Sequence, residues 1–233
     1  MEALDIIIAI LFIILCYIIG SIPFGLVFGK LICKKDIREY GSKNIGTTNA
    51  IRVLGKKVGF LVFFFDVFKG AFTILLVLLL EATNVWQSPA IIDYFLYGAF
   101  AIIGHCYSIF LGFKGGKAVA TSLGVVLVLT PLPAISCLII FGIIFFLTGY
   151  VSLASTGATI TVILTAWLLY FFGVSDVTNF GLYFISKPST ALVVLYSILS
   201  LLIIFKHFKN YKRLLNGTEN CFKKKKDKQQ KKL

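Results

Sequence analysis

The segment 112–117 reads GFKGGK and combines glycines with two lysines. Glycine lets backbone N–H groups approach an anion closely, and lysine supplies a compact positive charge. Apolar sequence flanks the segment on both sides, and a helix beginning near Ala118 would add its N-terminal dipole. The pattern predicts an anion site at the edge of a membrane, suited to a phosphorylated or acidic molecule.

A second polar segment, 41–55, reads GSKNIGTTNAIRVLG. Its first half supplies flexible backbone, hydroxyls and amides, which all contact phosphate groups in proteins, and Arg52 adds a cation. The alternative is a polar loop that caps the next helix through Thr47, Thr48 or Asn49. So many small polar residues in an otherwise apolar chain favour binding over capping.

Other polar residues carry weaker signals. Asp66 and Lys69 lie three residues apart inside an apolar run, so they share a helix face, and we interpret them as a neutralised structural pair. His105 fits a hydrogen-bonded histidine at the membrane interface. Ser155 begins a later apolar run, where serine usually bonds to the preceding helical turn.

The composition indicates a membrane protein. Of 233 residues, 58% are hydrophobic and 14% are charged, whereas about a quarter of the residues in a soluble domain are charged. Apolar runs long enough to cross a bilayer predict an all-α, polytopic integral membrane protein with about seven transmembrane helices. We expect these spans at 4–29, 58–80, 91–111, 117–130, 133–149, 152–172 and 189–206. The short fourth and fifth spans meet at a tight turn at 131–133, and the alternative is that they form one kinked helix or a re-entrant pair.

The charges predict the orientation. Most lysines and arginines fall in segments 30–57, 114–117 and 206–232, which seven spans place on one side. The positive-inside rule puts that side in the cytoplasm and the N-terminus outside. The lysine-rich end is expected to bind anionic lipids rather than nucleic acid, because it lacks interleaved aromatic residues. We therefore expect a membrane domain at 1–212 and a basic, disordered cytoplasmic tail at 213–233.

Two kinds of site have little support in the sequence. The five cysteines form no CxxC pair, and three of them sit within apolar runs, so neither disulfides nor a zinc site is expected. The ten acidic residues form no cytoplasmic cluster of the kind that holds magnesium. The sequence therefore predicts no zinc or magnesium site.

Several segments together resemble the bacterial acyl-phosphate:glycerol-3-phosphate acyltransferases. They are GSIPFG (20–25), GSKNIGTTNAIRVLGKKVG (41–59), DVFKG (66–70), GHCYSIFLGFKGGKAVAT (104–121), YVSLAS (150–155) and KHFKNYKRLLNGTE (206–219). The resemblance follows this order over nearly the whole chain. It implies a multi-pass enzyme of the bacterial plasma membrane, with its active site at the cytoplasmic face. It would move a fatty acyl group from acyl phosphate to the sn-1 hydroxyl of glycerol 3-phosphate, giving lysophosphatidic acid and phosphate.

The resemblance also implies site residues. The catalytic candidates are His207, Asn210, Ser155, Arg52 and Lys117. The substrate-binding candidates are Ser42, Asn44, Gly46, Thr47, Thr48, Asn49, Lys114, Gly115 and Gly116. Glu219 matches a carboxylate expected to be structural. The resemblance implies that neither a cofactor nor a metal is used. Functional coupling to the enzyme that makes acyl phosphate is also expected.

Three positions depart from the family's usual pattern. Ser108 replaces proline, Ala118 replaces a third glycine, and Lys206 replaces arginine. A transporter of a phosphorylated solute is the alternative, since it would also carry basic loops and broken helices. That alternative predicts inverted repeats and polar residues at mid-membrane, whereas the polar segments here cluster at one side.

Overall fold

The computed structural model describes residues 3–175 and 186–222, and the secondary structure of this part is helical, as predicted. Two short 3₁₀ helices, η1 (Ile37–Glu39) and η2 (Ile109–Leu111), lie in loops. The α-helices are α1 (Ala3–Ser21), α2 (Phe24–Cys33), α3 (Thr47–Leu54), α4 (Lys56–Ala82), α5 (Tyr94–Cys106), α6 (Val119–Leu129), α7 (Pro131–Thr148), α8 (Val151–Phe172), α10 (Thr190–Lys206) and α11 (Phe208–Leu215).

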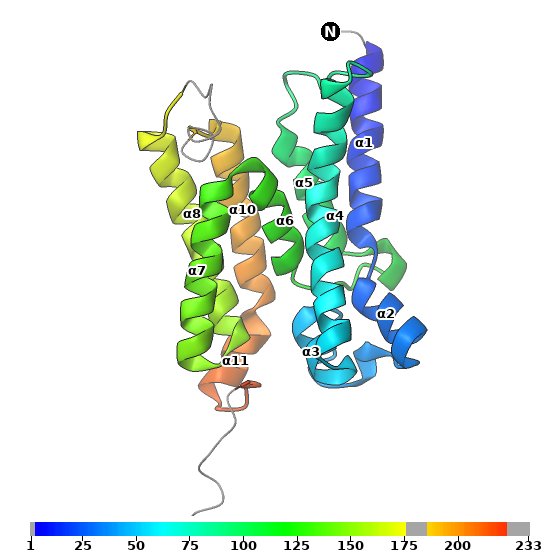
Figure 1. Ribbon diagram of the computed structural model, residues 1–233, viewed down its shortest axis with the longest axis vertical. Helices are drawn as coiled ribbons and strands as arrows, with labels where there is room; N and C mark the ends of the chain where they lie inside the picture. The colour runs from blue at the N-terminus through cyan, green and yellow to red at the C-terminus, as the bar shows by residue number, and fades with distance from the viewer. Residues whose placement is uncertain (1–2, 176–185, 223–233) are drawn as a thin grey trace, which may run out of the picture.

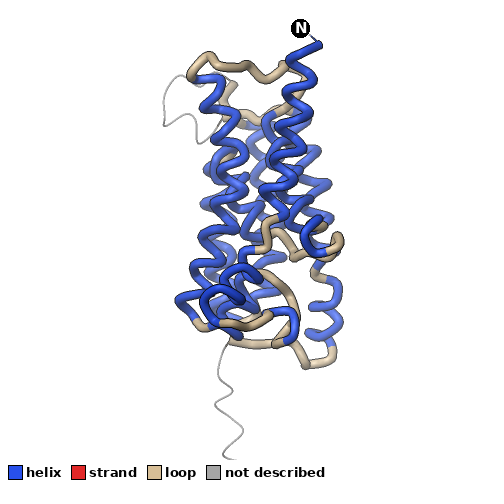
Figure 2. Tube along the Cα trace, turned by 90° about the vertical axis from the view of Figure 1, so that its right-hand side faces the viewer, coloured by secondary structure: helices blue, strands red, loops and turns tan. Residues whose placement is uncertain are grey.

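The long helices run side by side in a bundle (Figure 1). Helix α1 packs on α5, α4 on α6, and α7 on α8, while α10 completes the bundle next to α8. The short helices α2, α3 and α11 gather at one end, opposite the N-terminus, so the described parts of the basic segments 30–57 and 206–232 lie at the same end. Loops also collect at the two ends (Figure 2).

The helix lengths identify a multi-pass membrane protein. Helices α1, α4, α7 and α8 are long and apolar enough to cross a bilayer, as is α5 with its extension to Leu111. Helices α10 and α11 form a sixth candidate that bends by 46°. The span predicted at 117–130 is the 11-residue α6, which at about 16 Å is shorter than the hydrocarbon core. The number of spans and their orientation therefore stay predictions.

The first predicted span, 4–29, is not one helix, because the chain breaks at Ile22 and Pro23. Proline has no N–H and disfavours helical backbone at the residue before it, so carbonyl groups at the break lose their helical partners. Ser108 Oγ donates to the Ser21 carbonyl at 2.6 Å, and Lys69 Nζ donates to the Ile22 carbonyl at 2.8 Å. Two distant side chains thus satisfy the broken turn.

The predicted charge pair is confirmed as part of this arrangement. Lys69 Nζ lies 2.8 Å from Asp66 Oδ1, and each side chain is only 2% exposed. The pair is neutral as a whole, and its ammonium group completes the break between α1 and α2. Asp66 and Lys69 therefore connect α4 to the break between α1 and α2, as the interpretation of a structural pair predicted.

Small residues let the helices approach closely. A Cβ atom on Gly20 would lie 2.1 Å from the Ala101 carbonyl oxygen, and one on Gly70 would lie 2.1 Å from that of Thr121. These contacts join α1 to α5 and α4 to α6, in the way that small residues join membrane helices.

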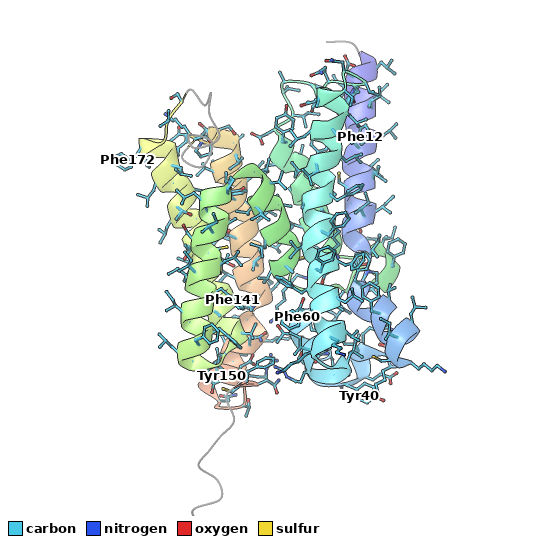
Figure 3. All side chains as sticks on the ribbon, viewed as in Figure 1. Phe12, Tyr40, Phe60, Phe141, Tyr150 and Phe172 are labelled. Carbon is cyan, nitrogen blue, oxygen red and sulfur yellow. The ribbon has the colours of Figure 1, made fainter. Side chains whose placement is uncertain are left out.

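Tyr40 and Tyr150 lie at the end that carries α3 and α11, and Phe172 lies at the opposite end (Figure 3).

Candidate active site

A polar cavity lies at the end of the bundle that carries α3 and α11. The loop before α3, the start of α6, the start of α8, and α11 all contribute to its wall. Most predicted site residues line it together: Ser42, Asn44, Gly46, Thr47, Thr48, Asn49, Arg52, Lys117, Ser155, His207 and Asn210. Lys114, Gly115 and Gly116 do not belong to this lining.

Lys117 is held by a chain of polar contacts. Its Nζ donates to Asn210 Oδ1 at 2.5 Å, and Asn210 Nδ2 donates to Glu219 Oε1 at 2.8 Å. Arg213 Nε in turn donates to Glu219 Oε2 at 2.6 Å. Glu219, whose side chain is 6% exposed, thus orients the amide that positions the lysine. Burial penalises the charged ammonium and lowers the pKa of Lys117 to about 8.

The chain beyond α11 belongs to this folded unit. Phe222 N–H donates to the Gly149 carbonyl at 2.9 Å, and the Phe222 ring packs against Phe145. The domain boundary predicted between residues 212 and 213 lies inside α11, so it coincides with no break in the structure. Residues 223–233, the rest of the predicted tail, lie outside the described residues.

The glycines of the 112–117 loop do not offer their amides to an anion. Gly115 N–H donates to the Cys106 carbonyl at 3.1 Å, and Gly116 N–H donates to the His105 carbonyl at 2.9 Å. A Cβ on Gly116 would lie 2.2 Å from His105 Nε2, so glycine is needed there for packing. The predicted substrate-binding role of Gly115 and Gly116 is corrected accordingly, and Lys114 is exposed.

His105 forms the support beneath that loop. Its ring is 4% exposed, and Nδ1 lies 3.3 Å from Thr121 Oγ1 and 3.6 Å from Asp66 Oδ1. These contacts connect the loop to α4 and α6 and fix the ring against Gly116. The interpretation of His105 as a hydrogen-bonded interior histidine agrees with this geometry.

Asn49 organises the polar loop before α3. Its Nδ2 lies 3.0 Å from the Ile37 carbonyl, 3.1 Å from that of Tyr40 and 3.0 Å from that of Asn44, while its Oδ1 accepts from Ser42 N–H at 2.9 Å. These bonds occupy the amide, which is 1% exposed. Direct phosphate binding by Asn49 is therefore replaced by a positioning role.

The same loop still presents donors to the cavity. Gly46 N–H is taken by Asn44 Oδ1 at 2.9 Å, but the N–H groups of Thr47 and Thr48 begin α3 and have no acceptor within the described chain. The Thr47 hydroxyl is buried without a hydrogen-bond partner among the described residues. The hydroxyl of Ser152, which also lines the cavity, is likewise buried without a hydrogen-bond partner among the described residues, and Ser152 is not among the site residues predicted from the sequence. The sequence did carry a signal, since Ser152 lies three residues before Ser155 on one helix face.

Two cations flank these donors. Arg52 lies with its guanidinium carbon 5.1 Å from the Phe222 ring centre, and no carboxylate in the described part of the chain pairs with it. Lys206 Nζ donates to the Cys106 carbonyl at 3.2 Å and lies 3.9 Å from the Tyr107 ring centre. Lys206 thus fixes the turn before the 112–117 loop. This role does not require the two parallel donors of an arginine.

His207 sits at the junction of α10 and α11, and its side chain is buried. Its Nδ1 lies 2.8 Å from the Ile203 carbonyl, which can only accept, so Nδ1 carries a proton. The lone pair of the neutral ring is then on Nε2. His207 lines the polar cavity and can accept or orient a hydroxyl proton there.

An apolar cavity adjoins the polar one inside the bundle. Both are lined by Phe63, Phe141, Val119 and Ala120, so they meet along these four residues. The remaining lining of the apolar cavity comes mainly from α5, α6, α8 and α10. The described residues contain no group of three or more His, Cys, Asp or Glu side chains placed to hold a metal ion.

Comparison with protein families matches residues 10–217 to the model described as glycerol-3-phosphate acyltransferase. The chain belongs to that family. A family member from Acholeplasma laidlawii, named glycerol-3-phosphate acyltransferase, is 42% identical over 228 residues, covering 94% of each chain. Another from Bacillus anthracis, named glycerol-3-phosphate acyltransferase 2, is 44% identical over 211 residues, covering 91% of this chain and 97% of that one.

Solved structures of the family share the fold. The glycerol 3-phosphate form of PlsY, described as an integral membrane glycerol 3-phosphate acyltransferase, matches with a TM-score of 0.76 and 35% identity, over 92% of this chain and 96% of that one. Its lysophosphatidic acid form matches with a TM-score of 0.74 at the same identity. These matches confirm the resemblance found in the sequence motifs and give the transporter alternative no support.

Proposed function

We propose that this protein is a membrane acyltransferase that moves a fatty acyl group from acyl phosphate to the sn-1 hydroxyl of glycerol 3-phosphate. The products are lysophosphatidic acid and inorganic phosphate, in the first step of phospholipid synthesis. Family membership supports the enzyme class and the acceptor. The acyl-phosphate donor is the finer part of the proposal and depends on the site.

The observation that carries the proposal is the junction of the two cavities. The polar cavity presents Arg52 and Lys117, which fit phosphate groups, together with the amides that begin α3. The apolar cavity opens from it at Phe63 and Phe141 and fits a hydrocarbon chain. An acyl phosphate has these two parts joined at the reacting carbonyl carbon, so that carbon would lie at the junction.

The reaction mainly requires the protein to position the two substrates and to stabilise the charges of their phosphate groups. The hydroxyl oxygen attacks the carbonyl carbon, the bond from that carbon to the phosphate oxygen breaks, and phosphate leaves with the electron pair. Holding both reactants in place contributes about 7–11 kcal/mol. Arg52 and Lys117 would offset the repulsion between two phosphates, and donors from Thr47 and Thr48 would stabilise the departing one.

The proton of the attacking hydroxyl needs an acceptor. We assign it to an oxygen of the substrate phosphate, so that the proton leaves with inorganic phosphate. His207 would orient the hydroxyl through Nε2, since Nδ1 is engaged by the Ile203 carbonyl. Ser155 and Asn210 would complete this wall of the site, Asn210 by holding Lys117.

The proposal includes the protein's place in the cell. The end carrying α3 and α11 would face the cytoplasm of a bacterium, because the basic segments gather there, and the chain would span the plasma membrane. The lysine-rich residues 223–233 would bind anionic lipids. Because acyl phosphate must reach the site from a water-poor source, we also propose coupling to the enzyme that makes it.

A donor-specific assay tests the function. Purified protein in detergent would receive palmitoyl phosphate with and without glycerol 3-phosphate, and lysophosphatidic acid would be measured by mass spectrometry. We expect product only with both substrates, and none when palmitoyl-CoA replaces palmitoyl phosphate. Product formed from palmitoyl-CoA alone would refute the donor assignment, and no product from any donor with folded protein would refute the function.

A pair of variants ties the activity to the site. Arg52→Ala removes a cation that lines the cavity, and we expect a loss of activity of about 100-fold. Lys35→Ala removes an exposed cation on a neighbouring segment outside the cavity and should leave activity within about twofold. Equal losses in both variants would show that net charge, rather than the cavity, determines activity.

A further inference from the structure

The apolar cavity extends into the bundle away from the polar cavity. Its lining runs from the junction with the polar site to Phe95 on α5 and Tyr196 on α10, which line its far end. Val119 at the junction and Val126 near the far end are seven residues apart on α6, which corresponds to about 10 Å along the axis. Ile203 and Tyr196 give the same span on α10. The cavity is thus deeper than it needs to be for the reacting carbonyl alone.

Phe95 and Tyr196 pack against each other at the far end of the cavity. The rings of Phe95 and Tyr196 meet edge to face with centroids 4.6 Å apart, and the side chains are 1% and 2% exposed. The Tyr196 hydroxyl lies 2.8 Å from Thr130 Oγ1 at the turn between α6 and α7. This hydrogen bond ties α10 to the α6–α7 turn, so Tyr196 cannot turn aside without losing it.

We propose that Phe95 and Tyr196 form the floor of an acyl-binding cavity and set the longest acyl chain that the enzyme transfers efficiently. This inference rests on the proposed function, because that function places the carbonyl carbon at the junction. Chain carbons beyond the floor would have to displace two buried rings or leave the cavity. Carbons above the floor gain burial in an apolar wall, so efficiency should rise with chain length and then fall sharply.

The test compares saturated acyl phosphates of increasing even chain length, with kcat/KM measured for each. Phe95→Ala removes half of the floor, and we expect the preferred chain to become longer. The first length beyond the wild-type optimum is two methylenes longer and should gain about 15-fold over that optimum, because each further buried methylene strengthens binding about fourfold. Val126→Phe raises the floor, and we expect the preferred chain to become shorter. KM for glycerol 3-phosphate should stay within about twofold in both variants.

A matched variant controls for the loss of a ring from α5. Phe100 lies on the same helix but outside the cavity lining, so Phe100→Ala should keep the wild-type length profile. A second readout does not need turnover: unreactive alkyl phosphates of the same lengths should raise the unfolding temperature with the same length profile. Folding of each variant is checked by its unfolding temperature without ligand.

The outcomes separate the floor from the function. A length profile that is unchanged in both Phe95→Ala and Val126→Phe, with folded proteins, would overturn the floor while leaving acyl transfer intact. An equal shift in Phe100→Ala would also overturn it. If the wild type transfers no acyl group, the alkyl phosphate profile still decides whether Phe95 and Val126 control the length of the bound chain.

Discussion

The two glycine-containing loops at the polar cavity, 41–49 and 112–117, offer different groups to an anion. The first leads into α3 and leaves the amides of Thr47 and Thr48 open, while the Asn44 and Asn49 side chains accept hydrogen bonds from backbone amides of the same loop. The second uses its glycine amides internally and presents only Lys117. What a glycine-rich loop can bind therefore depends on where its backbone donors already point.

The difference predicts that the second loop acts through a single charge. Lys117→Ala should lower kcat/KM by about 10²–10³-fold, because it removes the loop's only contact with the cavity. Lys114→Ala, which removes the exposed lysine of the same loop, should change it by less than about twofold. Comparable losses in the two variants, measured by steady-state kinetics, would mean that the loop binds substrate as a whole.

The first loop should instead lose its structure when the hydrogen bonds made by Asn49 are removed. Asn49→Asp keeps the shape of the side chain but places a carboxylate oxygen against three carbonyl groups, so we expect a loss of about 3 kcal/mol or more in stability. Asn49→Ala only removes the bonds and should cost less. The unfolding temperatures in detergent decide the order, and an Asp variant as stable as the wild type would contradict the positioning role.

The glycines of the second loop should matter for packing. Gly116→Ala brings a Cβ against His105 Nε2, and we expect a loss of about 1–3 kcal/mol from overpacking. Gly142→Ala on α7 serves as the control, because a Cβ there meets nothing within 4 Å and alanine is the better helix former. A stable Gly116→Ala protein with a raised KM would restore these glycines to a direct binding role.

The two loops should also respond differently to pH. Lys117 has a pKa of about 8 in the free enzyme, so it is charged below pH 8 and becomes neutral above it. KM for glycerol 3-phosphate should therefore rise above pH 8, at most about tenfold per pH unit. The amides of the first loop do not titrate. Lys117→Arg keeps its charge, so its KM profile should be flat over the same range.

The smallest expected effect concerns Ala118, which directly follows the 112–117 loop. Ala118 has φ of 58°, in the left-handed region where a Cβ is unfavourable. Ala118→Gly should therefore raise stability by about 1 kcal/mol with activity unchanged, which thermal unfolding can measure. An unstable glycine variant would mean that the Ala118 methyl contributes more by packing than it costs in strain.

Much of the fold could be predicted from local sequence. The apolar runs matched α4, α7, α8 and α10 closely, because length and hydropathy determine such helices. The break at Pro23 was missed because the residues on both sides remain apolar. Its stability comes from Ser108 and Lys69, which are distant in sequence. The prolines placed in a turn, Pro131 and Pro133, instead begin α7, where a missing N–H costs nothing.

The sequence predicted which residues gather at the site, but not the role of each residue. The polar segment 41–55 pointed to Arg52, and the family resemblance pointed to His207, and both line the cavity. The sequence does not show that the Asn49 amide bonds to three carbonyl groups, or that Gly116 leaves room for the His105 ring. Both depend on contacts made only in the folded chain. Residue type indicates what a side chain can bind, and packing decides whether it is free to do so.

The position of Phe222 has a practical consequence for altering the chain. Its ring covers Arg52, and the preceding Glu219 holds the network behind Lys117, so the last described turn is part of the active site. Shortening the protein after residue 222 should leave an intact enzyme, whereas shortening it after residue 216 should abolish activity. Labels or fusion partners joined directly after residue 222 therefore need a spacer, because Phe222 lies against Arg52 of the polar cavity.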